Sequence, residues 1–317
     1  MAHCLVTGGA GFIGSHLVER LLNSGHTVRV LDNLSTGSPR NLAGVASRIE
    51  FLEGAVENTR LCRRAVRGID WVFHEAALAS VPASVRRPRA THDSASTGTL
   101  VLLDSARRGG VQRVILACSS SCYGNLSAPP LTETSPLQTL SPYAAAKLSA
   151  EFYAEAFSRS YPLETVRLRY FNVFGPRQDP GGPYAAVIPL FVEALLSGRQ
   201  PVIFGDGRQS RDFTHVDNVT AANLLAAQAP DLSGRVFNIA GGRPLAVLEL
   251  LRTICRLLDV PCEPRLAPPR SGDILHSWAD ISAATRDLGY RVERSLEEGL
   301  RQTVAWYAAR HSSSGPD

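Results

Sequence analysis

The glycine-rich run at residues 8–14, GGAGFIG, constrains the fold more than any other segment. It follows a short apolar run and opens a stretch with helical periodicity over residues 12–24. Glycines at positions 8, 11 and 14 let the turn tighten, let a pyrophosphate approach the main chain and let the helix pack closely on the strand. The helix N-terminus adds free N–H groups. The run therefore predicts a strand, a dinucleotide-binding turn and a helix.

A carboxylate at the end of the second predicted strand indicates which dinucleotide binds. Asp32 closes the strand predicted at residues 27–31 and stands 18 residues after Gly14. At that place a carboxylate accepts hydrogen bonds from ribose hydroxyl groups and repels a 2′-phosphate. No arginine follows Asp32 immediately. The sequence therefore favours NAD over NADP.

The first half of the chain alternates β-branched runs with amphipathic helical stretches. This alternation predicts an α/β fold with a Rossmann-like doubly wound parallel sheet. After Phe174 the rhythm loosens, which indicates a smaller mixed α/β part. The predicted strands are residues 4–7, 27–31, 49–52, 71–74, 111–117, 164–169 and 202–204, and the predicted helices are residues 12–24, 60–67, 94–108, 142–159, 189–197 and 296–310, with irregular segments at 175–183 and 261–269.

Composition and charge exclude several classes of protein. Hydrophobic residues make up 44% of the 317 residues, and no apolar run approaches the ~18 residues of a spanning helix, so no membrane partner is expected. The N-terminus lacks a basic leader with an apolar core, which makes the cytoplasm the expected compartment. The net charge of +4 is scattered, which argues against a nucleic-acid partner. The six cysteines show no CxxC spacing and the eight histidines no HExxH pattern, so free thiols and no metal site are expected.

The basic residues comprise 32 arginines and a single lysine, Lys147. Ser141 and Pro142 are typical of a helix start, so Tyr143 and Lys147 lie one turn apart on one helix face. A phenol with an ordinary pKa of about 10 is a poor base at neutral pH. A nearby ammonium and a positively charged nicotinamide both favour the phenolate. The pair therefore predicts a general base, Tyr143, with Lys147 as its partner.

A cluster of hydroxyl groups follows the strand predicted at residues 111–117. Residues 119–124 read SSSCYG. Ligands bind at the carboxyl ends of strands in such sheets, so the cluster is expected over the nicotinamide site. Three consecutive serines are also compatible with a polar strand end.

These motifs are joined by RYFNVFGP at residues 169–176, GDG at 205–207, RDF at 211–213 and RSGD at 270–273. Together they resemble the extended short-chain dehydrogenase/reductases, specifically the nucleotide-sugar epimerases of the NAD-dependent epimerase/dehydratase family. The likeness covers nearly the whole chain in order. It implies a 4-epimerase that interconverts UDP-glucose and UDP-galactose, and UDP-GlcNAc and UDP-GalNAc, through a 4-keto intermediate.

The resemblance implies a role for each matching position. Ser119, Tyr143 and Lys147 match the catalytic residues. An aspartate that often contacts the adenine is replaced here by residues 54–56, GAV, so that contact is either lost or made by the Val56 main chain. The implied cofactor contacts are Gly8, Gly11, Phe12, Ile13, Gly14, Asp32, Asn33, Ser35, Thr36, Gly37, Ala55, Val56, Ala76, Ala77, Tyr143, Lys147 and Tyr170.

The resemblance also implies the sugar-nucleotide contacts. A small residue at Ser277 admits an N-acetyl group. The stretch at residues 183–189, which includes Val187, also resembles the branch that handles N-acetylated sugars, although it is equally compatible with simple core filling. Ser120 and Ser121 replace the Asp-Glu pair of the related dehydratases, which argues against dehydration. The implied substrate contacts are Ser119, Ser120, Ser121, Asn172, Val187, Val202, Phe204, Arg211, Arg270, Asp273 and Ser277.

Two alternatives stay open on sequence. A UDP-glucuronate 4-epimerase or decarboxylase needs one added donor for the sugar carboxylate, which Ser277, Arg177 or Thr214 could supply. An NAD-binding regulatory module on the same fold would dispense with Tyr143 and Lys147.

The resemblance finally implies a domain division and a homodimer. The NAD-binding domain is expected over residues 1–171 with a contribution from about 213–240, and the nucleotide-sugar-binding domain over 172–212 and 241–317. The dimer seam is expected on the helices at 94–108 and 142–159, although packing on the sheet competes for the same apolar positions. The candidate seam residues are Ala144, Leu148, Phe152 and Ala156.

Overall fold

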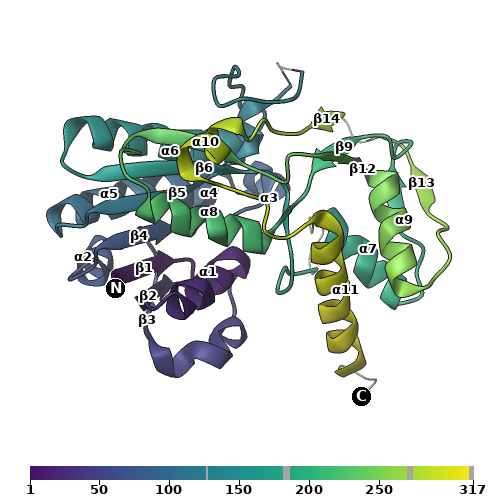
Figure 1. Cartoon of the computed structure of the whole chain (residues 1–317), viewed down its shortest axis with the longest axis horizontal. Coiled ribbons are helices and arrows are strands. Elements are labelled where there is room, and N and C mark those ends of the chain that lie inside the picture. The colour runs from purple at the N-terminus through teal and green to yellow at the C-terminus, as the bar shows by residue number, and fades with distance from the viewer. Residues whose placement is uncertain (126–127, 181–185, 270–273, 314–317) are drawn as a thin grey trace.

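The computed structural model describes residues 1–125, 128–180, 186–269 and 274–313. Its centre is a seven-stranded, entirely parallel sheet (Figure 1). The spatial order is β11-β6-β5-β4-β1-β2-β3, so the direction of winding reverses between β1 and β4. The strands are β1 (His3–Thr7), β2 (Thr27–Asp32), β3 (Ile49–Glu53), β4 (Trp71–His74), β5 (Arg113–Ser119), β6 (Glu164–Tyr170) and β11 (Arg235–Ile239).

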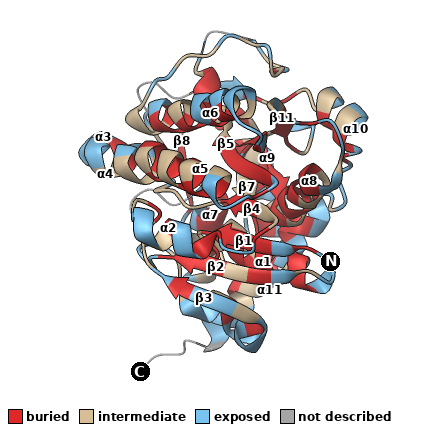
Figure 2. Cartoon of the chain, turned by 90° about the vertical axis from the view of Figure 1, so that its left-hand side faces the viewer, coloured by how far each residue is buried: buried red, intermediate tan, exposed pale blue. Residues whose placement is uncertain are grey.

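Helices cover both faces of this sheet because successive strand residues point to opposite faces. In β1, Cys4 and Val6 join the core cluster under one set of helices, whereas Leu5 joins the cluster under the other set. The first set is α1 (Phe12–Asn23), α8 (Val216–Gln228) and α10 (Ser282–Leu288), and the second is α2 (Thr59–Ala65), α5 (Gly98–Arg108) and α6 (Pro142–Ser160). The strands are mostly buried, whereas β3 at the sheet edge is largely exposed (Figure 2).

A second group of elements lies beside the sheet (Figure 1). Three helices enclose its core around Phe174, Ile203 and Phe213. Its helices are α7 (Val187–Leu196), α9 (Val247–Leu258) and α11 (Leu296–Ser313), and its strands are β7 (Val173–Phe174), β8 (Val202–Phe204), β9 (Ser210–Asp212), β10 (Thr214–His215), β12 (Pro244–Ala246), β13 (Arg265–Ala267) and β14 (His276–Ser277).

The predicted fold class is confirmed, and the differences concern short elements. The helix predicted at residues 94–108 begins as a π-helix, Asp93–Thr97, before α5. The irregular segment at 261–269 contains β13, which pairs with β8. Strands of two or three residues are too short to show a period of two, and tertiary pairing alone defines them. Further short elements are α3 (Val81–Arg86), α4 (Pro88–His92) and the 3-10 helices Pro39–Arg48 and Ser120–Tyr123.

All six cysteines are free thiols, as expected. None of the described helices is long and apolar enough to cross a bilayer.

Candidate active site

The turn between β1 and α1 admits only glycine at two positions. Gly8 has a φ of +70°, and a Cβ there would lie 2.7 Å from the Ala76 nitrogen. A Cβ on Gly14 would lie 2.1 Å from the Gly8 carbonyl oxygen, so α1 packs directly on the turn. Gly11 caps α1 without a side-chain hydrogen bond to its first-turn N–H groups. This uncapped N-terminus fits the diphosphate of a dinucleotide.

Asp32 fixes the turn from the end of β2. Its Oδ2 accepts a hydrogen bond from the Ala10 N–H at 2.9 Å, and its Oδ1 accepts one from the Leu34 N–H at 2.8 Å. Each carboxylate oxygen has a second lone pair, so ribose hydroxyl groups can still bind. The loop after β2 carries the predicted contacts Asn33, Ser35, Thr36 and Gly37. A Cβ on Gly37 would lie 2.8 Å from the Ala10 carbonyl carbon, so this loop rests on the turn.

Four further predicted cofactor residues follow β3 and β4, namely Ala55, Val56, Ala76 and Ala77. Ala76 lies against Gly8, and its N–H donates to the Thr7 hydroxyl at 3.4 Å. Val56 is 5% exposed, and its side chain packs on Gly98, where a Cβ would lie 2.6 Å from Val56 Cγ2. Because that side chain is in the core, only the Val56 main chain can face a ligand.

Ser119 ends β5 at the carboxyl edge of the sheet. Its Oγ accepts hydrogen bonds from the Ser121 N–H at 3.2 Å and from the Ser121 hydroxyl at 2.9 Å. With both acceptor positions taken, the Ser119 hydroxyl keeps its own proton to donate. Ser121 therefore orients Ser119, and a purely polar strand end is the weaker interpretation.

The start of α6 positions Tyr143 and Lys147. The Ser141 hydroxyl caps the helix by accepting from the Ala144 N–H at 3.1 Å, and the Tyr143 N–H donates to the Ser84 hydroxyl at 3.1 Å. Lys147 is 7% exposed, and its Nζ donates to the Ala117 carbonyl oxygen at 2.9 Å. The ammonium therefore lies at the end of β5, the strand that carries Ser119.

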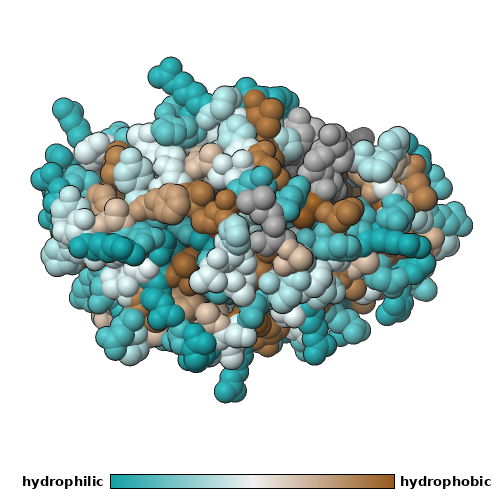
Figure 3. Space-filling model, turned by 90° about the horizontal axis from the view of Figure 1, so that it is seen from above, coloured by the Kyte–Doolittle hydropathy of each residue, from teal (hydrophilic) through white to brown (hydrophobic). Residues whose placement is uncertain are grey.

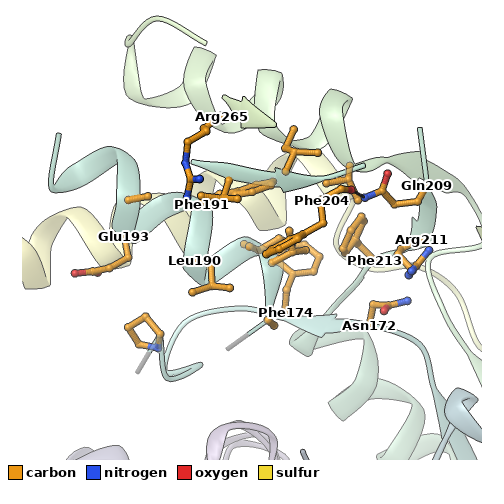
Figure 4. A pocket seen from close by; sticks show the side chains of 18 of the residues that line it. Asn172, Phe174, Leu190, Phe191, Glu193, Phe204, Gln209, Arg211, Phe213 and Arg265 are labelled. Atoms are coloured by element: carbon orange, nitrogen blue, oxygen red, sulfur yellow. Dashed lines mark hydrogen bonds between the residues drawn. The ribbon is translucent and has the colours of Figure 1, made fainter. Parts of the chain in front are cut away.

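A cavity of about 710 Å³ lies in the second group of elements. Aromatic side chains of Phe174, Phe204 and Phe213 line its middle, with Asn172 and Arg211 at one end (Figure 4). Five predicted substrate residues line this cavity, namely Asn172, Val187, Val202, Phe204 and Arg211. An apolar cavity with a few convergent polar groups is typical of a small-molecule site.

The other predicted substrate residues lie apart from this lining. Ser277 is 9% exposed and pairs with Arg211 between β14 and β9, beside the cavity. The Arg211 Nη1 donates to the main-chain oxygens of Ser210 and Leu275. Arg270 and Asp273 lie outside the described residues.

The family model of the NAD-dependent epimerases and dehydratases matches residues 4–240. The chain belongs to the NAD-dependent epimerase/dehydratase family. NAD is therefore its cofactor, and the glycine turn with Asp32 fits that group.

Three known proteins resemble the chain over nearly its whole length. The UDP-glucose 4-epimerase of Mycolicibacterium smegmatis is 39% identical over 96% of this chain and 97% of its own. The crystal structure of Thermotoga maritima UDP-glucose 4-epimerase with UDP-glucose has a TM-score of 0.92 at 41% identity, covering 97% and 99% of the two chains. The UDP-N-acetylglucosamine 4-epimerase of Methanobrevibacter ruminantium in complex with UDP-N-acetylmuramic acid has a TM-score of 0.93 at 40% identity, covering 98% and 99%.

Within this family fold, a neutral histidine supports the cofactor side of the site. His74 ends β4, where Nδ1 lies 2.7 Å from the Thr7 hydroxyl and Nε2 lies 2.9 Å from the Thr99 hydroxyl. Thr99 donates its own proton to the Ala95 carbonyl oxygen, so His74 Nε2–H donates and Nδ1 accepts. Burial, and secondly the charge of Lys147, lower the pKa of His74 to about 3. His74 therefore acts as an uncharged link between β1, β4 and α5.

A buried ion pair supports the segment after Ser119. The Arg169 guanidinium pairs with both carboxylate oxygens of Glu151, and its Nη1 donates to the Tyr123 hydroxyl at 2.8 Å. Tyr123 in turn donates to Asn238 Oδ1 at 2.6 Å. This network joins α6, β6 and β11 to the turn at residues 120–123, and sequence reasoning missed it.

Sequence reasoning also missed several cavity residues. Gln209 lines the cavity and its Nε2 donates to the Phe204 carbonyl oxygen at 2.8 Å, which fixes that strand end. Arg265 and Glu193 place charges at the end away from Arg211 (Figure 4). No local motif marks these residues, because the pairing of β8 with β13 brings Arg265 to the cavity.

The predicted cofactor residue Tyr170 has its hydroxyl group engaged inside the protein. The hydroxyl donates to Glu75 Oε1 at 2.7 Å and accepts from Asn223 Nδ2 at 2.7 Å. Its ring is part of the core under α1 and α8.

Proposed function

We propose that the protein is a UDP-hexose 4-epimerase that interconverts UDP-glucose and UDP-galactose, and UDP-GlcNAc and UDP-GalNAc. One observation carries the proposal: Lys147 Nζ binds the Ala117 carbonyl oxygen, two residues before Ser119 at the end of β5, and Tyr143 lies one helical turn from Lys147. The names of the three similar proteins, which are UDP-sugar 4-epimerases, support the same reaction.

In this proposal Tyr143 removes the proton of the sugar C4 hydroxyl group and later returns it. Ser119 donates its free hydroxyl hydrogen to the same sugar oxygen, and the Lys147 ammonium favours the phenolate. Bound NAD supplies the reversible oxidation at C4. The 4-keto sugar then turns over, so that either face can be reduced.

We further propose the family roles for the cofactor residues and the domain division. Gly8, Gly11, Phe12, Ile13 and Gly14 would hold the diphosphate at the N-terminus of α1, and Asp32 the adenosine ribose. The NAD-binding domain comprises residues 1–171 with about 213–240, and the nucleotide-sugar-binding domain comprises 172–212 and 241–317. The place of β11 in the seven-stranded sheet supports including residues 213–240.

For the substrate, we propose that the uracil lies between the aromatic side chains of the 710 Å³ cavity and that Arg211 binds the diphosphate. By the same family resemblance, we propose that Arg270 also binds the diphosphate and that Asp273 binds the uridine ribose. The small side chain of Ser277 favours acceptance of N-acetylated sugars. Against the UDP-glucuronate alternative, the Arg177 guanidinium pairs with Glu19 at 2.6 Å and lies 3.3 Å from the Ser15 hydroxyl, so its charge is engaged on α1.

We also propose a homodimer built on α6. Phe152 is 54% exposed and Tyr153 is 39% exposed, and both line a shallow groove with Leu148 and Ala156. Seen from above, hydrophobic side chains form a broken band across the molecule (Figure 3). Ala144 is 1% exposed and packs inside the chain, so we no longer include it among the residues of the dimer interface.

The test is a substrate panel with purified enzyme. UDP-glucose and UDP-GlcNAc should each yield the 4-epimer, and denaturation should release NAD, identified by mass spectrometry. Turnover of UDP-glucuronate alone would replace the substrate assignment. A protein that binds NAD and epimerises none of the three would revive the regulatory module.

A further inference from the structure

Glu75 directly follows β4, at the level of Ala117 on β5, whose carbonyl oxygen accepts from the Lys147 ammonium. His74 and Leu116 are paired across β4 and β5, and the next residue along each chain is Glu75 and Ala117, respectively. Lys147 Nζ donates to the Ala117 carbonyl oxygen at 2.9 Å. The reaction described above gives Glu75 no role.

Two buried side chains fix the orientation of this carboxyl group. The Tyr170 hydroxyl donates to Glu75 Oε1 at 2.7 Å, across the end of β5. Asn223 Nδ2 donates to the Tyr170 hydroxyl at 2.7 Å and to the Val219 carbonyl oxygen at 2.9 Å. Because Tyr170 accepts from Asn223, its proton points to Glu75, and Oε1 must accept. A proton that binds to the carboxyl group therefore binds to Oε2.

Among the neighbouring groups described below, Glu75 is the one whose charge changes near neutral pH. Burial raises the pKa of Glu75 to about 7, while the Tyr170 hydrogen bond and the Lys147 charge both lower it. On the same strand, burial keeps His74 uncharged with a pKa of about 3. Burial raises the pKa of Cys118 on β5 and of Tyr170 on β6 well above their ordinary values, so both stay neutral. The polar contacts from β1 and α8, Thr7 and Asn223, do not titrate.

We propose that Glu75 is a positioning residue that regulates the field of Lys147 at Tyr143. As a carboxylate it opposes the ammonium and weakens the preference for the Tyr143 phenolate. As the neutral acid it leaves the ammonium unopposed. Protonation of Glu75 on acidification therefore strengthens the preference for the phenolate, which extends the activity to lower pH. The inference rests on the proposed function, in which Tyr143 is the general base that takes the proton of the sugar C4 hydroxyl group.

The first test replaces Glu75 with glutamine, whose amide oxygen can still accept from Tyr170. The Glu75→Gln variant should show the acid limb of its kcat profile displaced to lower pH by about 0.5–1 unit. The matched control is Glu263→Gln, which removes an exposed carboxylate and should leave the profile in place. An unmoved acid limb, or one displaced to higher pH, would overturn the proposal.

A second readout does not depend on turnover. The ultraviolet phenolate absorbance of the NAD-bound enzyme is titrated with and without Tyr143→Phe, and the difference isolates Tyr143. Glu75→Gln should lower the midpoint of that difference by a similar amount. If the protein epimerises no sugar but this midpoint moves as expected, the proposed function fails and the Glu75 coupling stands. An unchanged midpoint in an active enzyme overturns the coupling alone.

Should the glutamine variant not fold, the wild-type protein provides the same information. Carbon-13 NMR of the Glu75 carboxyl carbon should give a midpoint near 7. In Lys147→Met that midpoint should rise by about 0.5 unit or more, because the neighbouring cation is lost. A midpoint that is the same in both proteins shows that the two groups do not interact, and the proposal falls.

Discussion

The Nζ atom of Lys147 donates a hydrogen bond to the Ala117 carbonyl oxygen, two residues before Ser119 on the same strand. A helix and a neighbouring strand thus share one contact that sets the distance between an ammonium and a hydroxyl group. Lys147 is the only lysine in the chain, and arginine cannot replace it here, because a planar guanidinium is wider than an ammonium on a slender stem.

Replacing either Tyr143 or Lys147 on α6 should remove most of the epimerase activity. Tyr143→Phe and Lys147→Met should each lower kcat by about 10²–10⁴-fold, as expected for loss of a general base or of the charge that tunes it. Tyr143→Phe should still fold and release NAD on denaturation. A kcat within threefold of wild type for either variant would contradict the assigned roles.

A methyl group at position 14 should disrupt the glycine turn. In Gly14→Ala the new Cβ would lie 2.1 Å from the Gly8 carbonyl oxygen, which is backbone and cannot turn away. We expect a loss of about 1–3 kcal/mol in the free energy of unfolding and a reduced content of bound NAD. Gly44→Ala is the control, because a Cβ there has no neighbour within 4 Å. Equal effects of the two substitutions would contradict this account of the turn.

The buried ion pair between Arg169 and Glu151 should contribute far more to the free energy of unfolding than an exposed ion pair does. Arg169→Met leaves the Glu151 carboxylate buried with only Arg167 at 3.8 Å, and should cost about 3 kcal/mol of unfolding free energy. Arg159→Met removes an exposed pair with Glu155 from the same helix and should cost less than about 1 kcal/mol. Denaturant unfolding measures both, and comparable losses would refute the distinction.

Arg211 offers a test that separates binding from chemistry. Arg211→Met should raise KM for UDP-sugars by about 10–100-fold, with little change in kcat, since a charged hydrogen bond to a diphosphate is worth about 1.5–3 kcal/mol. Arg208→Met is the control on the adjacent loop, where the arginine side chain is 89% exposed. A fall in kcat without a rise in KM would move Arg211 out of the diphosphate site.

Asp217 gives the fold a defined acid sensitivity. The hydrogen bond from His215, and further the Arg294 guanidinium at 3.2 Å, lower the pKa of Asp217 to about 2 despite partial burial. A lowered pKa in the folded state stabilises the fold above the ordinary value of 3.8, and that stability is lost as the pH falls toward 2. Asp217→Asn should therefore be less stable than wild type by about 1 kcal/mol at pH 7, and the difference should vanish near pH 2. A difference that is constant with pH would contradict this origin.

The sequence by itself determined the parts of the site that are contiguous or one helical turn apart. The glycine run, Asp32 at the next strand end, and Tyr143 four residues before Lys147 are such parts, because strand, turn and helix geometry follow from local residue types. The alternation of strands and helices also predicted the parallel sheet.

Only the tertiary structure decided which distant residues meet. Tyr170 reaches Glu75 across 95 positions in the chain, and Arg265 reaches the substrate cavity through a three-residue strand. The sequence shows no periodic pattern that would predict such contacts. They depend on the order of strands in the sheet and on paired strands that are too short to show an alternation of residues. The charge of a partly buried group such as Glu75 also depends on the tertiary structure, because burial and neighbouring charges exist only in the folded chain.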